Sequence, residues 1–290
     1  MADHVDGALA RETWRLAEPL HGMIYFAAEA LDRYTALGLR GMHMGYFASR
    51  GAAFGPVGAD VVISTFYNFS PKVVARAIPD AWAFADPTTI IAARRAGAEA
   101  ALRRALGPVA DGPEVAEAAE LAGRAARAAF DKTEGRPLFA AHAALDWPDE
   151  PLLSLWHAQT LLREFRGDGH IAALMIEGVS GIEALIMHSA TGAVPAETLR
   201  TMRAWSEEEW AAAVAGLQER GLLEPGDDIV FSETGRAQRQ WVEDKTDELS
   251  LPTYGAIGVD GCTRLGELVR PFSRAVVAAG MLPGRTNPPN

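Results

Sequence analysis

Apolar side chains recur at three- and four-residue intervals along most of this chain, and that spacing places them on one face of an α-helix. Residues 11–37 show the pattern clearly, with Glu29 and Asp32 lying off the apolar stripe. Alanine-rich stretches with the same spacing follow, and glycine or proline separates each from the next. The periodicity therefore predicts a mainly α-helical protein.

Local start signals define several of the predicted helices. Asp86 is a capping residue that stands directly before Pro87, and the pair predicts a helix that runs to about Leu106. Ser206 and Glu209 have the spacing of a capping box, in which each side chain bonds the backbone N–H of the other residue. The remaining predicted helices cover residues 59–67, 113–130, 156–176, 178–189, 195–204, 232–249 and 263–279, with a further helix starting at Ser70-Pro71.

One short stretch has the pattern of strands. Residues 222–223 and 229–231 are apolar runs on either side of Pro225-Gly226. A Pro-Gly turn between two such runs predicts a small β-hairpin. The hairpin follows the helix capped by Ser206 and precedes the closing helices, which is the position of the wing in a winged-helix protein.

The two halves of the chain repeat one order of features. Trp14 and Trp156 stand near the start of corresponding long helices, and a serine-capped helix follows in both halves. Such self-similarity predicts a duplicated module. Residues 1–135 would form an N-terminal winged-helix-like half with a reduced wing, and residues 136–290 a C-terminal winged-helix half, packed together as a single-chain pseudo-dimer. Chance agreement between alanine-rich helices is the alternative, because the order of the helices agrees better than the residues do.

Charge and composition exclude several classes of protein. The 290 residues carry a net charge of -11, so no global basic field attracts nucleic acid or an anionic membrane. Cys262 is the single cysteine, which excludes an internal disulfide and a metal site with several thiolate ligands. The first residues lack the cationic start and apolar run of a signal peptide, and no stretch approaches the roughly 18 apolar residues of a membrane span. These features predict a cytoplasmic protein without a membrane partner.

Several short motifs along the chain carry a family resemblance. They are Glu18-Pro19-Leu20-His21, Gly45-Tyr46-Phe47-Ala48-Ser49-Arg50, Thr65-Phe66-Tyr67-Asn68-Phe69, Trp156-His157, residues 162–170 and Trp205-Ser206-Glu207-Glu208-Glu209-Trp210. Through them the chain resembles the actinobacterial SalK-type helix-turn-helix family over nearly its full length. Residues 205–249 also resemble the MarR-type winged-helix proteins. The resemblance implies a fold and a transcription-regulator-like descent, and it implies no particular chemistry.

The segment that corresponds to a recognition helix is poorly suited to DNA. Residues 207–209 are all glutamate, whereas base edges and phosphates are read by Arg, Lys, Asn and Gln. Residues 195–250 hold thirteen acidic and six basic side chains, and the tip of the predicted wing at residues 227–228 is two aspartates. The matching helix of the first half offers only Lys72 and Arg76. Direct binding to nucleic acid is therefore disfavoured.

Polar residues on otherwise apolar helices are candidates for a ligand site between the two halves. His21 and Tyr25 are four residues apart and share a helix face. His43, Tyr46 and Arg50 have the i, i+3, i+7 spacing of a second shared face. The candidate ligand-binding residues are His21, Tyr25, His43, Tyr46, Arg50, Tyr67, His157, Arg163, Arg166, Asp168 and His170.

Residues 163–170 give the strongest of these signals. This stretch holds Arg163, Glu164, Arg166, Asp168 and His170, which is a high density of charge for a helix that faces a core. Glycines at positions 167 and 169 predict a break or kink within it. The structural alternatives are core histidines bonded to neighbouring groups and an ion-pair network that joins the halves.

No motif selects a cofactor. The chain lacks zinc-ligand spacing, a phosphate-binding glycine loop and the Gly-x-Ser-x-Gly pattern of hydrolases. A haem with His21, His142 or His170 as axial ligand remains open, so the cofactor is unknown. The catalytic residues, if any, are unknown as well.

Three functions remain consistent with the sequence. The first is a small-molecule-binding protein of helix-turn-helix regulator descent, with a ligand cavity between the halves, weak or no DNA binding and homodimer formation left open. The second is an enzyme of specialised metabolism that uses the same cavity, in which a histidine acts as general base and an arginine holds an anionic group. The third is a DNA-binding transcriptional regulator.

Overall fold

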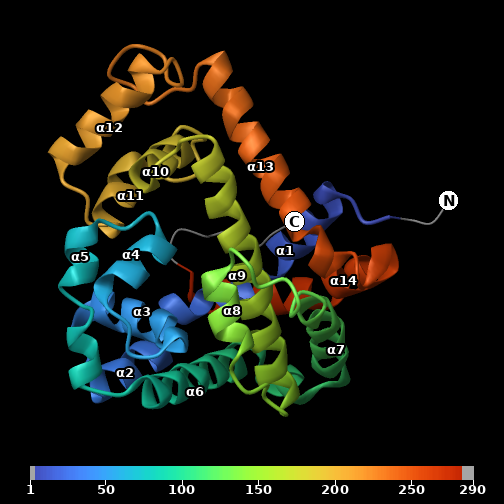
Figure 1. Cartoon of the computed structure of the whole chain (residues 1–290). Helices are drawn as coiled ribbons and strands as arrows, with labels where there is room; N and C mark the ends of the chain where they lie inside the picture. Colours follow the sequence, from blue (N-terminus) through green and yellow to red (C-terminus); the bar gives the residue numbers. More distant parts are fainter. Residues whose placement is uncertain (1–3, 283–290) are drawn as a thin grey trace.

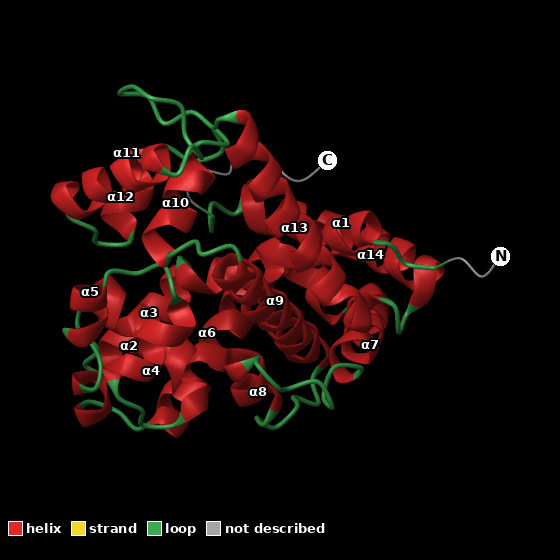
Figure 2. Cartoon of the chain, turned by 45° about the horizontal axis from the view of Figure 1, so that its top comes forward, coloured by secondary structure: helices red, strands yellow, loops and turns green. Residues whose placement is uncertain are grey.

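The computed structural model describes residues 4–282, and within that range every regular element is a helix (Figures 1 and 2). The prediction of a mainly α-helical protein is therefore confirmed. The α-helices are α1 (Gly7–Gly22), α2 (Ala28–Ala36), α3 (Gly41–Gly51), α4 (Ala59–Phe66), α5 (Pro71–Ala75), α6 (Pro87–Leu106), α7 (Pro113–Arg127), α8 (Pro137–Ala143), α9 (Pro151–Ile176), α10 (Gly181–Ser189), α11 (Ala196–Met202), α12 (Glu207–Glu219), α13 (Glu233–Tyr254) and α14 (Gly258–Ala278), with short 3-10 helices at Met23–Tyr25, Ala52–Phe54, Asp80–Ala83 and Gly107–Asp111.

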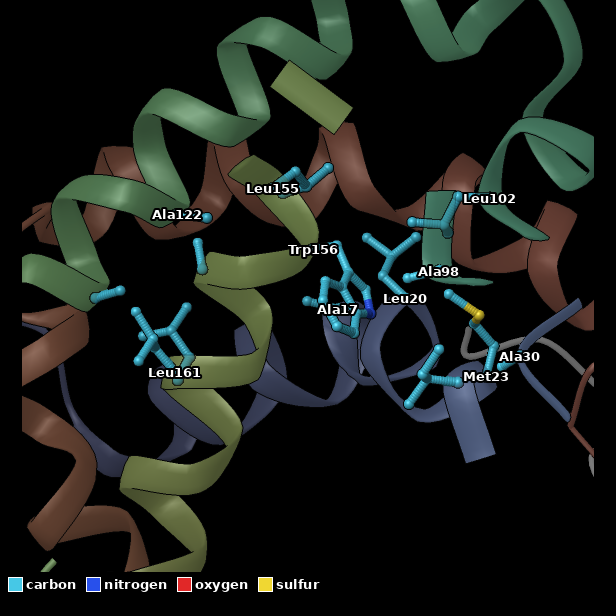
Figure 3. Packing of buried hydrophobic residues seen from close by; sticks show 14 of the residues in the cluster. Ala17, Leu20, Met23, Ala30, Ala98, Leu102, Ala122, Leu155, Trp156 and Leu161 are labelled. Carbon is cyan, nitrogen blue, oxygen red and sulfur yellow. The ribbon is translucent and has the colours of Figure 1, made fainter. Parts of the chain in front are cut away.

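Helix α9 passes through the middle of the molecule and contacts α1, α6, α7, α8 and α13 (Figure 1). Small side chains let these helices approach closely, because a Cβ on Gly97 of α6 would lie only 2.8 Å from the Cα of Ala30 in α2. Figure 3 shows part of the packing, where Leu20 of α1, Leu102 of α6 and Trp156 of α9 belong to one apolar cluster. The alanine-rich sequence thus builds a core from closely spaced helices.

The buried apolar side chains form two clusters. The larger core includes residues from Val5 to Met281, and a separate cluster, here called the small module, is built within residues 173–242. Helices α9 and α13 contribute to both clusters and so connect them. The division at residue 135 stays a prediction; apolar side chains from both sides of it lie in the larger core.

The predicted fold of two winged-helix halves with a β-hairpin wing is wrong, since residues 4–282 contain no strand. At the expected wing, Leu223 and Phe231 form a single isolated antiparallel bridge. A strand alternates its side chains between two faces, whereas Leu222 and Leu223 are both buried in the small module. Pro225 lacks the N–H that a longer ladder would need. The two short apolar runs therefore anchor a loop.

Capping residues predicted the starts of helices correctly, whereas glycines inside helices led to a wrong prediction of a helix break. Asp86 accepts a hydrogen bond from the Thr89 N–H, and Ser206 and Glu209 form the predicted capping box. The predicted continuous helix over residues 11–37 is instead divided into α1, a 3-10 turn and α2, because the backbone of Ala27 is extended. The predicted break near residue 168 is also wrong, since α9 is helical throughout.

No single described helix is both long and apolar enough to cross a membrane. Helices α9 and α10 reach the required length and apolarity only when taken together, and they are bent by 99° at their junction.

Candidate functional site

A group of polar side chains lies inside the molecule where α1, α3, α6 and α9 meet. It combines four guanidinium groups with two tyrosines, a histidine and one carboxylate. Its members come from both sides of residue 135. We call it the arginine–tyrosine cluster, and it consists of His21, Tyr25, Tyr46, Arg50, Arg94, Arg163, Glu164 and Arg203.

An ion pair between α3 and α9 forms the floor of the cluster. Arg50 Nε and Nη2 donate to the two carboxylate oxygens of Glu164 at 3.0 and 2.7 Å, and Arg163 Nη1 donates to the same carboxylate at 3.2 Å. Both side chains of the Arg50–Glu164 pair are buried. Burial favours the neutral acid, but Arg50 and Arg163 outweigh it and hold the pKa of Glu164 well below its usual value. Glu164 is therefore a carboxylate anion that pairs with both Arg50 and Arg163.

His21 is held by hydrogen bonds at both ring nitrogens. Nδ1 lies 3.0 Å from Thr160 Oγ1, and Nε2 lies 2.8 Å from Tyr25 Oη. Burial, together with the charges of Arg163 and Arg94, lowers the pKa of His21 well below its ordinary value. The ring is consequently neutral near pH 7, and neither nitrogen is free to ligate a haem iron.

Arg94 of α6 is the unusual member of the cluster. It is only 3% exposed, and its Nε, Nη1 and Nη2 atoms have no hydrogen-bond partner. The guanidinium lies 5.5 Å from the ring centre of Tyr25 and 5.4 Å from that of Trp156. Cation–π contacts compensate only part of the cost of taking a guanidinium out of water. Its polar neighbour is the buried, neutral hydroxyl of Tyr34, and none of the described ion pairs gives the five donor hydrogens of Arg94 a carboxylate.

The positive charge converges on Tyr46. Arg50 Nη1 donates to the Tyr46 hydroxyl at 3.3 Å. Burial alone raises the pKa of a phenol, but Arg50, Arg203 and Arg163 outweigh that effect and lower the pKa of Tyr46. The hydrogen bonds and ion pairs of the described residues supply one carboxylate, Glu164, against the four guanidinium groups.

Arg203 links the cluster to the small module. It follows α11, its guanidinium lies 4.4 Å from the ring centre of Phe69, and its Nε donates to Asn68 Oδ1 at 3.2 Å. Its own carbonyl accepts from the Ser70 N–H at 2.9 Å. The neighbouring Ala204 has φ +58°, a conformation that costs a residue with a Cβ about 1–2 kcal/mol. The chain therefore turns sharply at the point where Arg203 enters the cluster.

Five of the eleven predicted site residues are brought together in this cluster: His21, Tyr25, Tyr46, Arg50 and Arg163. They approach from α1, the turn after it, α3 and α9. No described contact tests whether they bind a ligand, so their role as a site remains a proposal.

Three other predicted residues lie apart from the cluster. His43 lies 3.4 Å from the carbonyl oxygen of Met202 and lines a surface cavity of about 510 Å³. The Tyr67 hydroxyl donates to the Val179 carbonyl in the small module. His157 packs edge-on against Trp147 at a ring separation of 5.0 Å, and burial lowers the pKa of His157 to about 3.

The last three predicted residues lie on other faces of α9. Arg166 Nη1 donates to Asp247 Oδ1 at 2.7 Å, and His170 Nδ1 lies 2.9 Å from Thr246 Oγ1, both in α13. Asp168 accepts from the Phe139 N–H at 2.9 Å, and burial raises the pKa of Asp168 to about 6. The dense polar stretch of α9 is thus divided among three different neighbours, because successive residues of a helix point in different directions.

Three residues of the cluster were not among the predicted site residues. They are Arg94, Arg203 and Glu164, the carboxylate that pairs with Arg50 and Arg163. Glu164 stands in the polar stretch identified from the sequence, one turn after Thr160. Arg203 belongs to a segment that the sequence associates with DNA contacts. Arg94 stands beside Arg95 in an alanine-rich helix, and neither of them was singled out from the sequence.

Metal ligation has no support in the geometry of residues 4–282, where no group of three or more His, Cys, Asp or Glu side chains is arranged around a common point. The donor set of the arginine–tyrosine cluster is instead cationic, which suits an anion.

Residues 10–283 match the model of a family described as a helix-turn-helix family, and the chain belongs to that family. No curated protein and no solved structure matches the chain.

Proposed function

We propose that this helix-turn-helix family member binds a small anionic molecule in the arginine–tyrosine cluster and has weak or no affinity for DNA. The cluster lies between segments from the two halves of the sequence, as expected for the proposed ligand site. Its excess of guanidinium groups over carboxylates indicates the charge of the ligand, and its tyrosines indicate a partly aromatic environment.

Arg94 carries this proposal. A buried guanidinium without a hydrogen-bond partner costs several kcal/mol unless an anion satisfies it. Arg94 is buried, and the residues one turn away from it in α6, Ile90 and Ala98, are apolar and buried as well. A sequence that keeps an arginine here accepts a less stable fold, and sites of binding are where proteins accept such a cost.

The cluster also has an accessible side. Glu164 is 1% exposed at its side chain, whereas the adjacent Arg163 side chain retains 27% exposure. Tyr25, Tyr46 and Arg203 are likewise only half-buried. An anion that enters along these side chains would meet the buried Arg94 behind them.

The exposed surface of α12 supports the proposal that the protein has weak or no affinity for DNA. Its solvent-facing residues include Glu207, Glu208 and Glu219, with alanines between them. The nearby Arg200 is paired with Glu197 at 2.8 Å and with Glu207 at 3.2 Å. Phosphate contacts need free cations, so this helix would repel a DNA backbone.

The test is a thermal-shift screen with a panel of anions at constant ionic strength: inorganic phosphate, phosphate monoesters, aliphatic carboxylates and aromatic carboxylates, each against chloride. We expect at least one anion to raise the Tm of the wild-type protein by several degrees, because binding to the folded state alone stabilises it. The variant Arg94→Met should lose that shift.

The control is Arg95→Met, which removes the neighbouring charge. Arg95 Nη2 donates to the Asp146 carbonyl at 2.6 Å, outside the cluster, so the anion-dependent shift should persist. A panel in which no anion exceeds chloride, or an Arg94→Met variant that keeps the shift, would remove the basis of the proposal. A tight, salt-sensitive gel shift with DNA would contradict its second part.

A further inference from the structure

The hydrogen bonds around His21 have a fixed direction. Thr160 donates its single hydroxyl hydrogen to the Trp156 carbonyl at 3.0 Å, so its oxygen faces His21 as an acceptor. His21 Nδ1 must therefore carry the ring hydrogen. In a neutral imidazole the other nitrogen, Nε2, is then an acceptor, and the bond of 2.8 Å to Tyr25 requires the tyrosine hydroxyl to donate.

This chain of bonds leaves Tyr25 as an acceptor toward the cluster. Its one hydroxyl hydrogen is used by His21, so only lone pairs of Oη remain. Tyr25 lies between two of the guanidinium groups, since Arg94 and Arg163 are each 5.5 Å from its ring centre. An anion held by both arginines would lie beside the Tyr25 side chain, whose one polar atom is Oη.

The hydrogen-bonding capacity that remains in the rest of the cluster is donor capacity. Arg94 has no partner for its N–H groups, and the Tyr46 hydroxyl accepts from Arg50, which leaves its own hydrogen to give. Glu164 has both oxygens engaged by Arg50 and Arg163. Tyr25 Oη is thus an acceptor among donors. A ligand oxygen that bears no hydrogen would face it with lone pair against lone pair.

We infer that Tyr25 makes this site select anions that carry a hydrogen-bond donor of their own, such as a hydrogen phosphate or a hydroxy acid, over anions that carry none. His21 is the positioning residue that fixes the tyrosine as an acceptor. The inference rests on the proposed function, because it assumes that the anion binds in the arginine–tyrosine cluster.

Inorganic phosphate and sulfate are the matched probes. At about pH 8 phosphate is mainly the dianion with one P–OH group, and sulfate has the same charge and shape without a hydrogen. Isothermal titration of the full chain should show phosphate binding about ten-fold more tightly than sulfate, as for one hydrogen bond gained and one repulsive contact avoided. Equal affinities would overturn the selectivity and leave the anion site intact. No binding of either anion would overturn the inference, while the thermal-shift panel of phosphate monoesters and carboxylates decides separately whether the anion site exists.

Two variants separate the acceptor from its positioning group. Tyr25→Phe removes the acceptor and should bring the ratio of phosphate to sulfate affinity close to one. His21→Leu frees the hydroxyl hydrogen of Tyr25, so sulfate should gain affinity relative to phosphate, which a loss of packing alone would not produce. Tyr254→Phe, a change to a buried tyrosine in α13, is the control and should keep the wild-type ratio.

The direction of the relay is also measurable in the wild-type protein without a ligand. Nitrogen-15 NMR of labelled imidazole rings distinguishes the two neutral tautomers and the cation. We expect His21 to be neutral with its hydrogen on Nδ1 at pH 7. A hydrogen on Nε2, or a doubly protonated ring, would make Tyr25 an acceptor from His21 and would overturn the inference.

Discussion

Helix α9 places two buried arginine networks on different faces, and the two differ in their balance of charge. On the α13 side, Arg166 pairs with Asp247 at 2.7 Å and with Glu243 at 3.6 Å. Arg11 of α1 pairs with Asp247 at 2.6 Å, and Arg239 pairs with Glu243 at 2.6 Å. Asp244 lies 3.6 Å from Arg11 and supplies a third carboxylate. We call these six residues the α9–α13 joint. Every cation in the joint has a carboxylate.

The arginine–tyrosine cluster is not balanced in this way. Glu164 serves Arg50 and Arg163, while Arg94 has no hydrogen-bond partner. A balanced buried network needs nothing from outside and connects helices, whereas an unbalanced one is completed only by an added anion. Buried charge alone therefore does not distinguish the two networks, and the proposed anion site rests on the excess of one sign in the cluster.

Both networks nevertheless contain the same hydrogen-bond arrangement, a histidine bonded to a threonine hydroxyl. His21 bonds Thr160, whose hydroxyl donates to the carbonyl four residues earlier, and His170 bonds Thr246 in the same manner. In the cluster the second nitrogen of the ring continues to a tyrosine. The arrangement therefore orients a ring in both places, and only its surroundings differ.

The largest expected effect comes from breaking the balanced network. Asp247→Asn removes the carboxylate shared by Arg11 and Arg166 and leaves the buried Arg166 without its closest partner. We expect the free energy of unfolding to fall by about 3–5 kcal/mol, the usual cost of leaving a buried charge unpaired. Urea denaturation at pH 7 measures the change.

Asp244→Asn is the matched control in the same helix. Its side chain is 56% exposed and lies 3.6 Å from Arg11, so its removal should cost less than about 1 kcal/mol. Similar losses for Asp244→Asn and Asp247→Asn would show that the joint does not depend on buried pairing.

In the arginine–tyrosine cluster we expect a substitution to raise the free energy of unfolding rather than lower it. Arg94→Met replaces an unpaired buried guanidinium with an apolar chain of similar length, between the rings of Tyr25 and Trp156. In the absence of added anions we expect the free energy of unfolding to rise by about 1–3 kcal/mol. Urea denaturation in chloride buffer checks the sign.

The same measurement on Arg95→Met gives the reference for a half-buried arginine one position away, where a change within about 0.5 kcal/mol is expected. A loss of stability in Arg94→Met would mean that Arg94 is a structural residue, and the distinction between the two networks would disappear.

The sequence predicted helices where the signal is local. Asp86 before Pro87 and the capping box of Ser206 specify their own helix starts, because the bonds involved reach only three residues. The prediction of a β-hairpin wing was wrong because a strand needs a series of hydrogen bonds to a second strand. The single bridge at Leu223 does not supply them. Tertiary packing likewise kept α9 helical through Gly167 and Gly169.

Five of the eight residues of the arginine–tyrosine cluster were predictable for a similar reason. Polar residues on an apolar face, such as His21 and Arg50, are visible from helical spacing alone. Arg94 and Arg95 are adjacent in the sequence, and the packing of α6 decides that Arg94 is buried while Arg95 reaches the Asp146 carbonyl. Charge balance is a property of several helices together, so no single stretch of sequence contains it.

The smallest effect concerns the histidine of the balanced network. Burial lowers the pKa of His170 to about 4, with Arg239 and Arg166 adding to the decrease and Glu243 opposing it. The unfolded ring has its ordinary pKa near 6.5. Below that pH the unfolded state binds a proton that the folded state does not, so the stability of the wild type falls as the pH decreases from about 6.5 toward 4.

His170→Gln keeps a donor for Thr246 and removes the titration. At pH 8 both proteins hold neutral side chains, and their unfolding free energies should differ only by altered packing. At pH 5.5 the variant should gain about 1 kcal/mol relative to the wild type, the value of one proton over one pH unit after allowance for partial exposure. Urea denaturation at a series of pH values measures the slope. Parallel pH profiles would show that His170 is protonated in the folded joint, where Glu243 would then neutralise it and extend the balance of the network to its histidine.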